Sequence, residues 1–271
     1  MMTAPTLLLV GCGKMGGALM RGWVNSPNPP RLFILDRKLQ DAPAGSTVFR
    51  TPEEITTDVT PDIIVLAVKP AGAETVLKAL RQSLGARMDK AALLSVMAGK
   101  NCEKLAEWCG RADMPIIRTM PNTPSSVGAG STGLYASPHV SREQKELAIR
   151  LMEQVGTVVP VPHEEDLRSV IAIAGSAPAY VFLLAELLEK AGQDLGLEQQ
   201  AARTLVRSMI YGVGKMLHEL PDDAEALRRN VTSPNGTTAA ALNVFMAEEN
   251  WPRLIPLAAE AAIKRSRELD D

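Results

Sequence analysis

Aromatic residues are scarce in this chain of 271 residues, which contains only 3 Trp, 3 Tyr and 4 Phe. So few rings disfavour a protein that stacks nucleic-acid bases on aromatic side chains. Neither sign of charge is in excess, because 29 Lys and Arg residues face 31 Asp and Glu residues and the formal net charge is −2. Binding nucleic acid through a basic surface requires clustered cations. We therefore expect no nucleic-acid partner.

Cysteine and histidine are also sparse, with three residues of each. Cys102 and Cys109 lie seven residues apart, outside the short CxxC spacing of zinc sites. The histidines lie outside any distinctive motif, and no hydrolase signature such as HExxH is present. We expect no metal site, and we expect free thiols in a reducing, cytoplasmic setting.

Long apolar runs are absent as well, since no uninterrupted run approaches the roughly 20 residues that cross a bilayer. The short run Leu7–Val10 has no basic leader and precedes a glycine-rich turn, so it predicts a strand and not a signal peptide. Hydrophobic residues nevertheless make up 46% of the chain, which excludes a disordered protein. We expect a soluble protein with no membrane partner and with one large core or two of moderate size.

Strand-like and helix-like segments alternate in the first half of the chain. The alternation predicts a Rossmann-type, doubly wound α/β sheet with right-handed crossovers. The strands are mostly continuous apolar runs, as is typical of parallel strands covered on both faces. They are expected at Thr6–Val10, Arg31–Leu35, Ile63–Val68, Leu93–Met97 and Ile116–Thr119, with Thr132–Tyr135 and Thr157–Val161 as extensions. Helices are expected near Gly13–Asn25, Ala71–Leu84, Cys102–Cys109 and Ser141–Val155.

The second half contains no strand-like alternation and predicts helices only. These are expected at Ala177–Leu195, Gln199–Leu220, Asp222–Arg229, Thr237–Glu248 and Pro252–Glu268. The first two are so apolar that they need a partner, and a second subunit is a plausible one. We expect a domain boundary after residue 162, with an α/β domain over residues 1–162 and a helical domain over residues 163–271.

A glycine-rich loop follows the first expected strand and opens the first expected helix. Gly11, Gly13 and Gly16 fit the G-x-G-x-x-G pattern, with Lys14 and Met15 between the last two. In such a loop the first glycine allows a tight turn, the second lets the backbone approach a pyrophosphate, and the third permits close helix–strand packing. The helix N-terminus supplies N–H donors and partial positive charge. The loop predicts a dinucleotide site.

The end of the second expected strand carries conflicting signals about which dinucleotide binds. Asp36 lies 20 residues after Gly16, where an acid usually holds the ribose hydroxyls of NAD. Arg37 and Lys38 follow at once, and such cations can bind the 2′-phosphate of NADP. The pattern leaves NADP and NAD both open.

Four later segments carry residues unusual for plain scaffolding. Two of them end strands at the carboxyl edge of the expected sheet, where ligands bind in such folds. The third has a proline near the first turn of a long helix, and the fourth places hydroxyl and N–H groups at a helix N-terminus, which suits an anion. They are Ala67–Pro70, Arg118–Pro124, Gly175–Tyr180 and Asn230–Thr238.

In their order along nearly the whole chain, these segments resemble the pyrroline-5-carboxylate reductase family. The most specific piece is Val231–Thr238, which is similar to that family's substrate loop. The chain departs from the usual pattern at Asn235 and Ala177, where the family usually has Gly, and at Glu54, where some members have Asn. Asn tolerates left-handed backbone angles, so we expect the turn at Asn235 to survive.

The resemblance implies an NAD(P)H-dependent reduction of 1-pyrroline-5-carboxylate to proline, with NADPH as cofactor and NADH as an alternative. It implies a Rossmann-type dinucleotide-binding domain over residues 1–162 and a helical dimerisation and substrate domain over residues 163–271. Such chains form homodimers, which can assemble into rings. The cofactor contacts that it suggests beyond Asp36, Arg37 and Lys38 are Gly11, Gly13, Lys14, Met15, Gly16, Val68, Lys69, Ala98 and Asn230. The substrate contacts that it suggests are Glu164 and the loop residues Ser233, Gly236, Thr237 and Thr238.

A chemistry consistent with these residues needs no strong side-chain acid, because a cyclic iminium accepts hydride readily and the cofactor carries the hard step. Backbone N–H groups of Gly236, Thr237 and Thr238 suit the substrate carboxylate. The Thr238 hydroxyl can both accept from an iminium and donate to an amine, so we expect it at the ring nitrogen as the catalytic group.

Two alternatives remain beside this interpretation. A β-hydroxyacid dehydrogenase shares the two-domain plan but needs a catalytic Lys early in the first long C-terminal helix, and Ala177 to Glu189 contains none. A non-catalytic NAD(P)-sensing regulator would keep the glycine loop but has no reason to keep the threonine-rich loop before residue 238.

Overall fold

The computed structural model describes residues 4–270, with Asp270 described by its backbone only. Two compact units divide the chain. A sheet unit comprises the residues up to Ser176 together with the end of the last helix from Ala262, and a helical unit comprises Ala177–Ala261. This division differs from the expected boundary after residue 162, because the segment after the last strand packs on the sheet. A Cβ on Gly133 would lie 2.7 Å from the Val170 side chain, which shows how closely that segment approaches.

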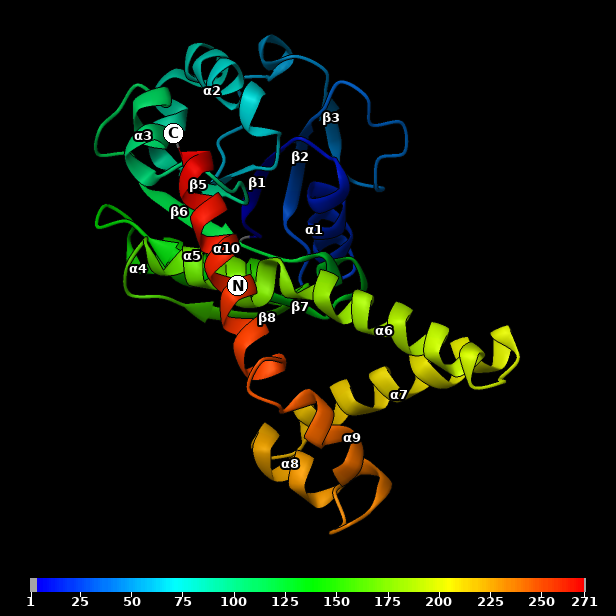
Figure 1. The fold of residues 1–271 in the computed structure, drawn as a ribbon. Helices are drawn as coiled ribbons and strands as arrows, with labels where there is room; N and C mark the ends of the chain where they lie inside the picture. The colour runs from blue at the N-terminus through cyan, green and yellow to red at the C-terminus, as the bar shows by residue number, and fades with distance from the viewer. Residues whose placement is uncertain (1–3, 271) are drawn as a thin grey trace. The chain divides into compact units, whose positions relative to one another are not determined.

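The sheet unit contains eight strands in the order β3-β2-β1-β4-β5-β6-β7-β8 (Figure 1). Neighbouring strands are parallel except for the antiparallel pair β6 and β7. The doubly wound α/β fold is therefore confirmed. The strands are β1 (Thr6–Val10), β2 (Arg31–Leu35), β3 (Thr47–Phe49), β4 (Ile63–Leu66), β5 (Ala92–Ser95), β6 (Ile116–Met120), β7 (Gly130–Ala136) and β8 (Gly156–Pro160).

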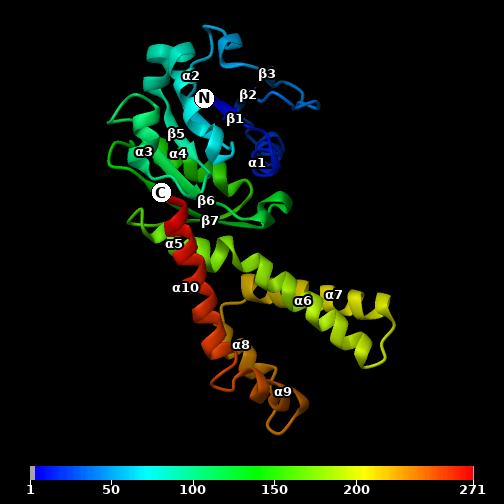
Figure 2. The same ribbon diagram turned by 45° about the horizontal axis from the view of Figure 1, so that its top comes forward.

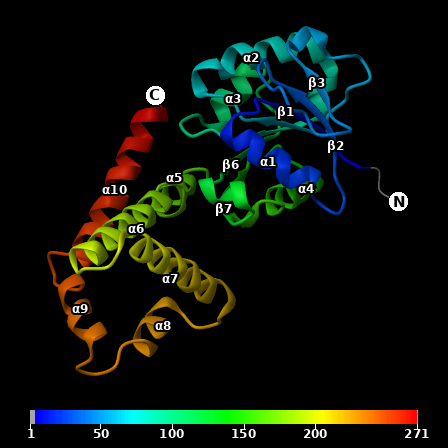
Figure 3. The ribbon, with the colours of Figure 1, turned by 90° about the vertical axis from the view of Figure 1, so that its right-hand side faces the viewer.

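Helices cover both faces of this sheet, which is why its central strands are apolar runs without alternation (Figure 3). Helices α2 (Pro70–Leu84) and α3 (Cys102–Trp108) pack on one face, and α1 (Lys14–Val24) and α4 (Arg142–Glu153) pack on the other. The indole of Trp23 is fully buried, and its Nε1 donates to the carbonyl oxygen of Leu151 at 2.9 Å. Helices α1 and α4 are thereby tied together.

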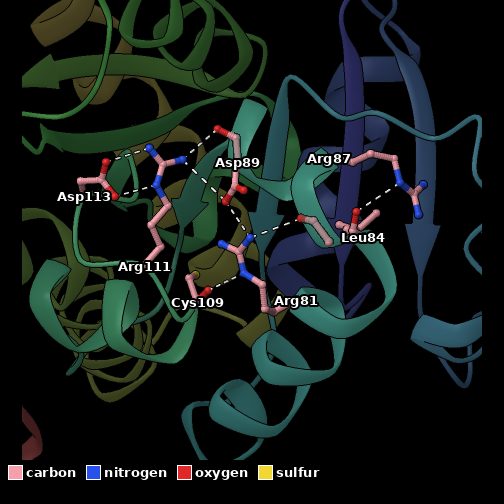
Figure 4. Close-up of polar contacts among 8 residues, drawn as sticks. Arg81, Leu84, Arg87, Asp89, Cys109, Arg111 and Asp113 are labelled. Carbon is pink, nitrogen blue, oxygen red and sulfur yellow. Dashed lines mark hydrogen bonds and ion pairs between the residues drawn. The ribbon is translucent and has the colours of Figure 1, made fainter.

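A polar cluster fixes the far end of α2 (Figure 4). The Arg81 guanidinium donates to the carbonyl oxygen of Cys109 at 2.7 Å and to the Asp89 carboxylate at 2.6 Å. Arg111 pairs with both Asp89 and Asp113. Burial raises the pKa of Cys109 to about 12, so its thiol stays protonated beside this cluster.

After β8 the chain forms helix α5 (Asp166–Val170) and a π-helical segment, Ile171–Gly175, and the π-helical segment was not predicted from the sequence. The N–H of Ser176 donates to the carbonyl oxygen of Ile171, five residues earlier, at 2.7 Å. The Asn122 side chain braces this segment, because its Nδ2 donates to Ala174 O at 3.1 Å while its Oδ1 accepts from Ser131 N at 2.9 Å.

The helical unit is built from α6 (Ala177–Asp194), α7 (Gln199–Glu219), α8 (Ala224–Asn230), α9 (Thr237–Phe245) and the first part of α10 (Trp251–Asp270). Helices α6 and α7 lie side by side as a hairpin (Figures 1 and 2). Within residues 177–261 only Ala202 is buried, and many large apolar side chains are exposed in the single chain.

One helical stretch, Asp166–Asp194, is long and apolar enough to cross a membrane by length and composition alone, with a mean hydropathy of 1.8 over its most apolar window. Only 6% of that window is buried within the single chain. The sequence reading had found no run of this length, because Gly175, Ser176 and Pro178 interrupt the apolar residues.

Candidate functional site

The glycine loop joins β1 to α1, as the sequence predicted, and two of its glycines are required by close backbone contacts. Gly11 has a φ of +89°, and a Cβ there would lie 2.8 Å from the Val68 side chain and 2.9 Å from the carbonyl oxygen of Ala67. A Cβ on Gly16 would collide with the carbonyl oxygen of Gly11. Gly13 is different, because no atom lies within 4 Å of the position that its Cβ would occupy.

The space beside Gly13 opens into a hollow of about 1120 Å³ over the carboxyl ends of β1, β2 and β4. Seven of the predicted cofactor residues line this hollow: Gly11, Gly13, Asp36, Arg37, Lys38, Val68 and Lys69. Lys14, Met15 and Gly16 instead form the first turn of α1, whose N-cap Gly13 makes no side-chain capping bond. The hollow thus combines uncapped helix N–H groups with room for a backbone-bound pyrophosphate, and its residues fit a dinucleotide.

The carboxylate of Asp36 is occupied by backbone donors. Its Oδ2 accepts from the N–H of Cys12 at 2.7 Å, and its Oδ1 accepts from the N–H groups of Lys38 at 2.7 Å and Leu39 at 2.9 Å. Partial burial opposes ionisation, but these three bonds and the nearby charge of Arg50 outweigh it and lower the pKa of Asp36. Asp36 therefore ties the end of β2 to the glycine loop.

Arg50 also lines the hollow and was missed by the sequence reasoning. Its Nη1 donates to the backbone oxygen of Asp36 at 2.9 Å, and its own N–H donates to the Glu54 carboxylate at 2.7 Å. The signal that could have found it is strand register, because β3 pairs with β2 through Leu35 and Phe49 and so places the following residues, Asp36 and Arg50, side by side.

Glu164 lies in the sheet unit, in a half-buried ion pair. Its Oε1 accepts from Arg118 at 2.8 Å and from the N–H of Cys102 at 2.7 Å. The Arg118 side chain is 8% exposed, and its Nε is buried without a hydrogen-bond partner. Burial, and then the charge of Glu164, raise the pKa of the Cys102 thiol, so this thiol stays protonated.

The predicted substrate loop lies in the helical unit, between α8 and α9. Asn235 has a φ of +56°, which confirms the expected left-handed turn at this departure from the family pattern. A Cβ on Gly236 would meet the Ser233 hydroxyl, which is the rotatable end of a side chain, and the φ of Gly236 is −83°, so this position does not require glycine. Gly236 caps α9 without a side-chain bond, and Thr237 and Thr238 begin the helix, so their N–H groups are available to an anion.

The structure brings the predicted residues together in two sets. Most of the cofactor residues gather in the sheet unit, where Ala98 is also found, exposed after β5. Asn230, at the end of α8, and the substrate loop belong to the helical unit, whose first residue is Ala177. Glu164 is the one predicted substrate residue in the sheet unit. In the described part of the chain, residues 4–270, no cluster of three His, Cys, Asp or Glu side chains could hold a metal ion.

Two family models match the chain. One, described as pyrroline-5-carboxylate reductase dimerisation, matches residues 164–269. The other, described as NADP oxidoreductase coenzyme F420-dependent, matches residues 6–99.

Full-length relatives extend this similarity. The pyrroline-5-carboxylate reductase of Pseudomonas aeruginosa is 34% identical over 99% of this chain and 98% of its own length. That of Haemophilus influenzae is 34% identical over 97% of both chains. Among solved structures, a pyrroline-5-carboxylate reductase from Coxiella burnetii superposes with a TM-score of 0.90 at 33% identity, covering 99% of this chain and all of its own. A Plasmodium falciparum pyrroline carboxylate reductase with NADP bound superposes with a TM-score of 0.85 at 29% identity, covering both chains completely.

Proposed function

The chain belongs to the pyrroline-5-carboxylate reductase family, and on that premise we propose that it reduces 1-pyrroline-5-carboxylate to L-proline with NAD(P)H, the last step of proline synthesis. The observation that carries the proposal is the coexistence, in one chain, of the dinucleotide hollow and the uncapped N-terminus of α9. A nucleotide-sensing regulator has no use for the second feature. The rival β-hydroxyacid dehydrogenase family is set aside by the family membership.

The dinucleotide is bound, in this proposal, by the sheet unit. Uncapped N–H groups at the start of α1 hold the pyrophosphate, and the open face of Gly13 lets it approach the backbone. Val68, Lys69 and Ala98 follow strand ends at the same edge of the sheet, and we assign them to the cofactor together with Asn230. When bound, the nicotinamide supplies hydride.

The substrate carboxylate is bound, in this proposal, by the N–H groups of Thr237 and Thr238. The N–H of Gly236, which the sequence also assigned to the carboxylate, instead donates within the turn. The macrodipole of α9 favours an anion there, and no side chain of the unit caps the helix. Ser233 supports the turn, because its carbonyl oxygen accepts from Gly236 N at 3.1 Å. Glu164 already holds Arg118 and the backbone of Cys102, so any contact with substrate uses its second oxygen.

We assign Thr238 to the ring nitrogen of the imine. Its hydroxyl accepts a hydrogen bond from the iminium proton and later donates to the amine lone pair, so one group serves both charge states. Proximity and orientation then supply most of the rate acceleration, and no side chain has to deliver a proton of its own.

We further propose that the chain works as a homodimer, or as a ring of dimers, in the cytoplasm. The family match over residues 164–269 supports self-association, and the exposed apolar faces of α6 and α7 are what a second copy would cover. On this proposal the apolar stretch Asp166–Asp194 meets protein and not lipid. The balanced charge gives no basis for a nucleic-acid partner.

The direct test is oxidation of NADPH or NADH by the purified protein, followed at 340 nm with and without 1-pyrroline-5-carboxylate. Oxidation must depend on the imine and must produce proline in equal amount. Tight nucleotide binding without turnover would instead establish the regulator.

Thr238→Ala should lower kcat/KM for the imine by about tenfold to a hundredfold, which is about 1.4 kcal/mol of transition-state stabilisation for each tenfold. Thr238→Ser keeps the hydroxyl and should retain most of the activity. Equal kinetics for the parent and the alanine variant would remove Thr238 from the mechanism.

A further inference from the structure

The end of β2 is the part of the cofactor hollow where the sequence gave two opposed signals, an acid for a ribose hydroxyl and cations for a 2′-phosphate. A carboxylate offers about four acceptor positions, and backbone N–H groups of Cys12, Lys38 and Leu39 fill three of those on Asp36. One of these donors belongs to the glycine loop itself. The side chain is therefore committed to holding the loop against the strand.

Cationic side chains outnumber acidic ones along the hollow. Arg21, Arg37, Lys38, Arg50 and Lys69 all line the hollow, against the acidic side chains of Asp36 and Asp41. Elsewhere in the sheet unit the exposed arginines Arg31 and Arg142 have acidic partners, Asp58 and Glu146. Arg37, Lys38 and Arg50 have no carboxylate within the 4 Å of an ion pair among residues 4–270, so their charge is left for a ligand.

Arg50 differs from its two neighbours in being held in place. Its side chain is anchored through Nη1 to the backbone oxygen of Asp36, and its main chain is anchored through its N–H to Glu54. A guanidinium has five N–H donors in a planar fork, so one anchoring bond leaves donors free for a phosphate. Anchoring reduces the side-chain entropy lost on binding, which makes Arg50 a better phosphate ligand than a free surface arginine.

We propose that Arg50 is a specificity-determining residue that binds the 2′-phosphate of NADPH together with Arg37 and Lys38, and that Asp36 is a positioning residue for the glycine loop. The inference rests on the proposed use of NAD(P)H and deepens it, because it makes NADPH the preferred cofactor. It also gives Glu54 a role. The acid that replaces the Asn of some family members holds the backbone of the arginine that binds the phosphate.

The test compares two small probes that differ by one phosphate, adenosine 2′,5′-bisphosphate and adenosine 5′-monophosphate. Their dissociation constants are measured by calorimetry on the full-length protein without imine, so the result does not depend on turnover. Arg50→Met keeps the length of the side chain and removes its charge. Arg142→Met is the matched control, since Arg142 is an exposed arginine of the same unit that pairs with Glu146 on α4 and does not line the hollow.

Arg50→Met should lower the affinity for the bisphosphate by about tenfold, which is about 1.4 kcal/mol, and should change the affinity for the monophosphate by less than about twofold. Arg142→Met should change neither. Retained monophosphate binding shows that the variant is folded. An equal loss of affinity for both probes, or no loss for either, overturns the role of Arg50. If only Arg37→Met lowers the affinity for the bisphosphate, the 2′-phosphate is assigned to Arg37.

Asp36→Asn separates the two roles of the acid. If Asp36 positions the loop, Asp36→Asn should lower the affinity for both probes equally, because the loop that holds their shared 5′-phosphate is loosened. If Asp36 instead binds the ribose, Asp36→Asn should lower the affinity for the monophosphate, whose 2′-hydroxyl is free, more than the affinity for the bisphosphate, and that result would overturn the assignment.

In steady-state assays Arg50→Met should raise KM for NADPH about tenfold and leave KM for NADH unchanged. If the imine assay shows no turnover at all, the probe result still stands, so failure of the catalytic proposal remains distinguishable.

Discussion

The two units of this chain solve the problem of burying apolar surface in opposite ways. In the sheet unit, Leu7, Leu8 and Leu9 of β1 are all fully buried, and helices close both faces of the sheet. In the helical unit, Ala202 is the only buried residue of the 85 between Ala177 and Ala261. The first unit contains its own core, and the second exposes the surface from which a core could be built.

Helix α7 shows the difference most clearly. Leu205, Met209 and Met216 recur at helical spacing along one side of it and are 59%, 45% and 43% exposed. A contiguous apolar stripe of this kind marks an interaction surface. The comparison teaches that the sheet unit buries its own apolar surface, whereas the helical unit leaves its apolar surface exposed, as suits the dimerisation family that it matches.

A charge in the apolar stripe on α7 should disrupt self-association through the helical unit and leave nucleotide binding by the sheet unit intact. Leu205→Asp places an unpaired carboxylate in the surface between subunits, at a cost of several kcal/mol. We expect dissociation in sedimentation velocity and a fall in imine reduction of at least about a hundredfold, with adenosine 5′-monophosphate binding unchanged.

The control is Arg203→Asp, which puts the same side chain on the same helix about 200° round from Leu205 and should remain assembled and active. A Leu205→Asp protein that stays associated and fully active would contradict the dependence on self-association. Association only with detergent or lipid vesicles would show that the apolar face meets lipid.

Within the sheet unit, glycines of one loop should respond differently to the same methyl group. Gly16→Ala drives a Cβ into the backbone oxygen of Gly11, which cannot move aside. We expect a stability loss of about 2 kcal/mol in urea unfolding and loss of dinucleotide binding.

Gly13→Ala meets no atom within 4 Å and should keep its stability within about 0.5 kcal/mol, while its affinity for NADPH falls because the methyl stands where the pyrophosphate approaches. Equal loss of stability in the two variants would show that the loop is generally tight and not shaped for a ligand.

The difference in burial between the two units could be predicted from the sequence, because the spacing of apolar residues indicates which faces of a strand or helix are buried. Continuous apolar runs predicted β1 and β2 with their observed bounds, Thr6–Val10 and Arg31–Leu35. Strand β3 was missed, since Thr47–Phe49 is too short to show a pattern and is held by pairing with β2. The π-helical segment Ile171–Gly175 was also missed, and the Asn122 amide that donates to Ala174 O within it makes a tertiary contact that a local pattern does not show.

The candidate site could also be predicted from the sequence only in part. The glycine pattern and the strand ends pointed to residues that do line one hollow, because backbone geometry dictated those residue types. Arg50 could not be found this way, since its position depends on the register of a strand that was not predicted. The structural role of Asp36 could not be predicted either, because the sequence shows a carboxylate but not the three N–H groups that donate to it.

A smaller effect should come from the ion pair beneath α5. Arg118→Met leaves the Glu164 carboxylate, whose side chain is 23% exposed, with only the N–H of Cys102. Losing one partner of a largely buried pair should cost about 2 kcal/mol in urea unfolding at fixed protein concentration, and the double variant Arg118→Met/Glu164→Gln should recover part of it. The more exposed pair of Arg142 and Glu146 is the reference, and Arg142→Met should cost at most about 0.5 kcal/mol. Equal losses at the two sites would mean that the buried pair contributes nothing special to the sheet unit.

The smallest expected effect is the pH dependence that Asp36 gives to the sheet unit. Because backbone N–H groups lower the pKa of Asp36 in the folded protein, its ionised form contributes stability above the ordinary carboxylate pKa of about 3.9, and this contribution is lost as the pH falls through the folded value. The difference in urea midpoint between the parent and Asp36→Asn should therefore be fully present at about pH 7 and should close below about pH 4. Other carboxylates titrate in the same range, but they titrate in both proteins and cancel from the difference. A difference that stayed constant down to about pH 3 would mean that the charge on Asp36 is not what holds the glycine loop to β2, and the shape of the side chain alone would then explain its place in the site.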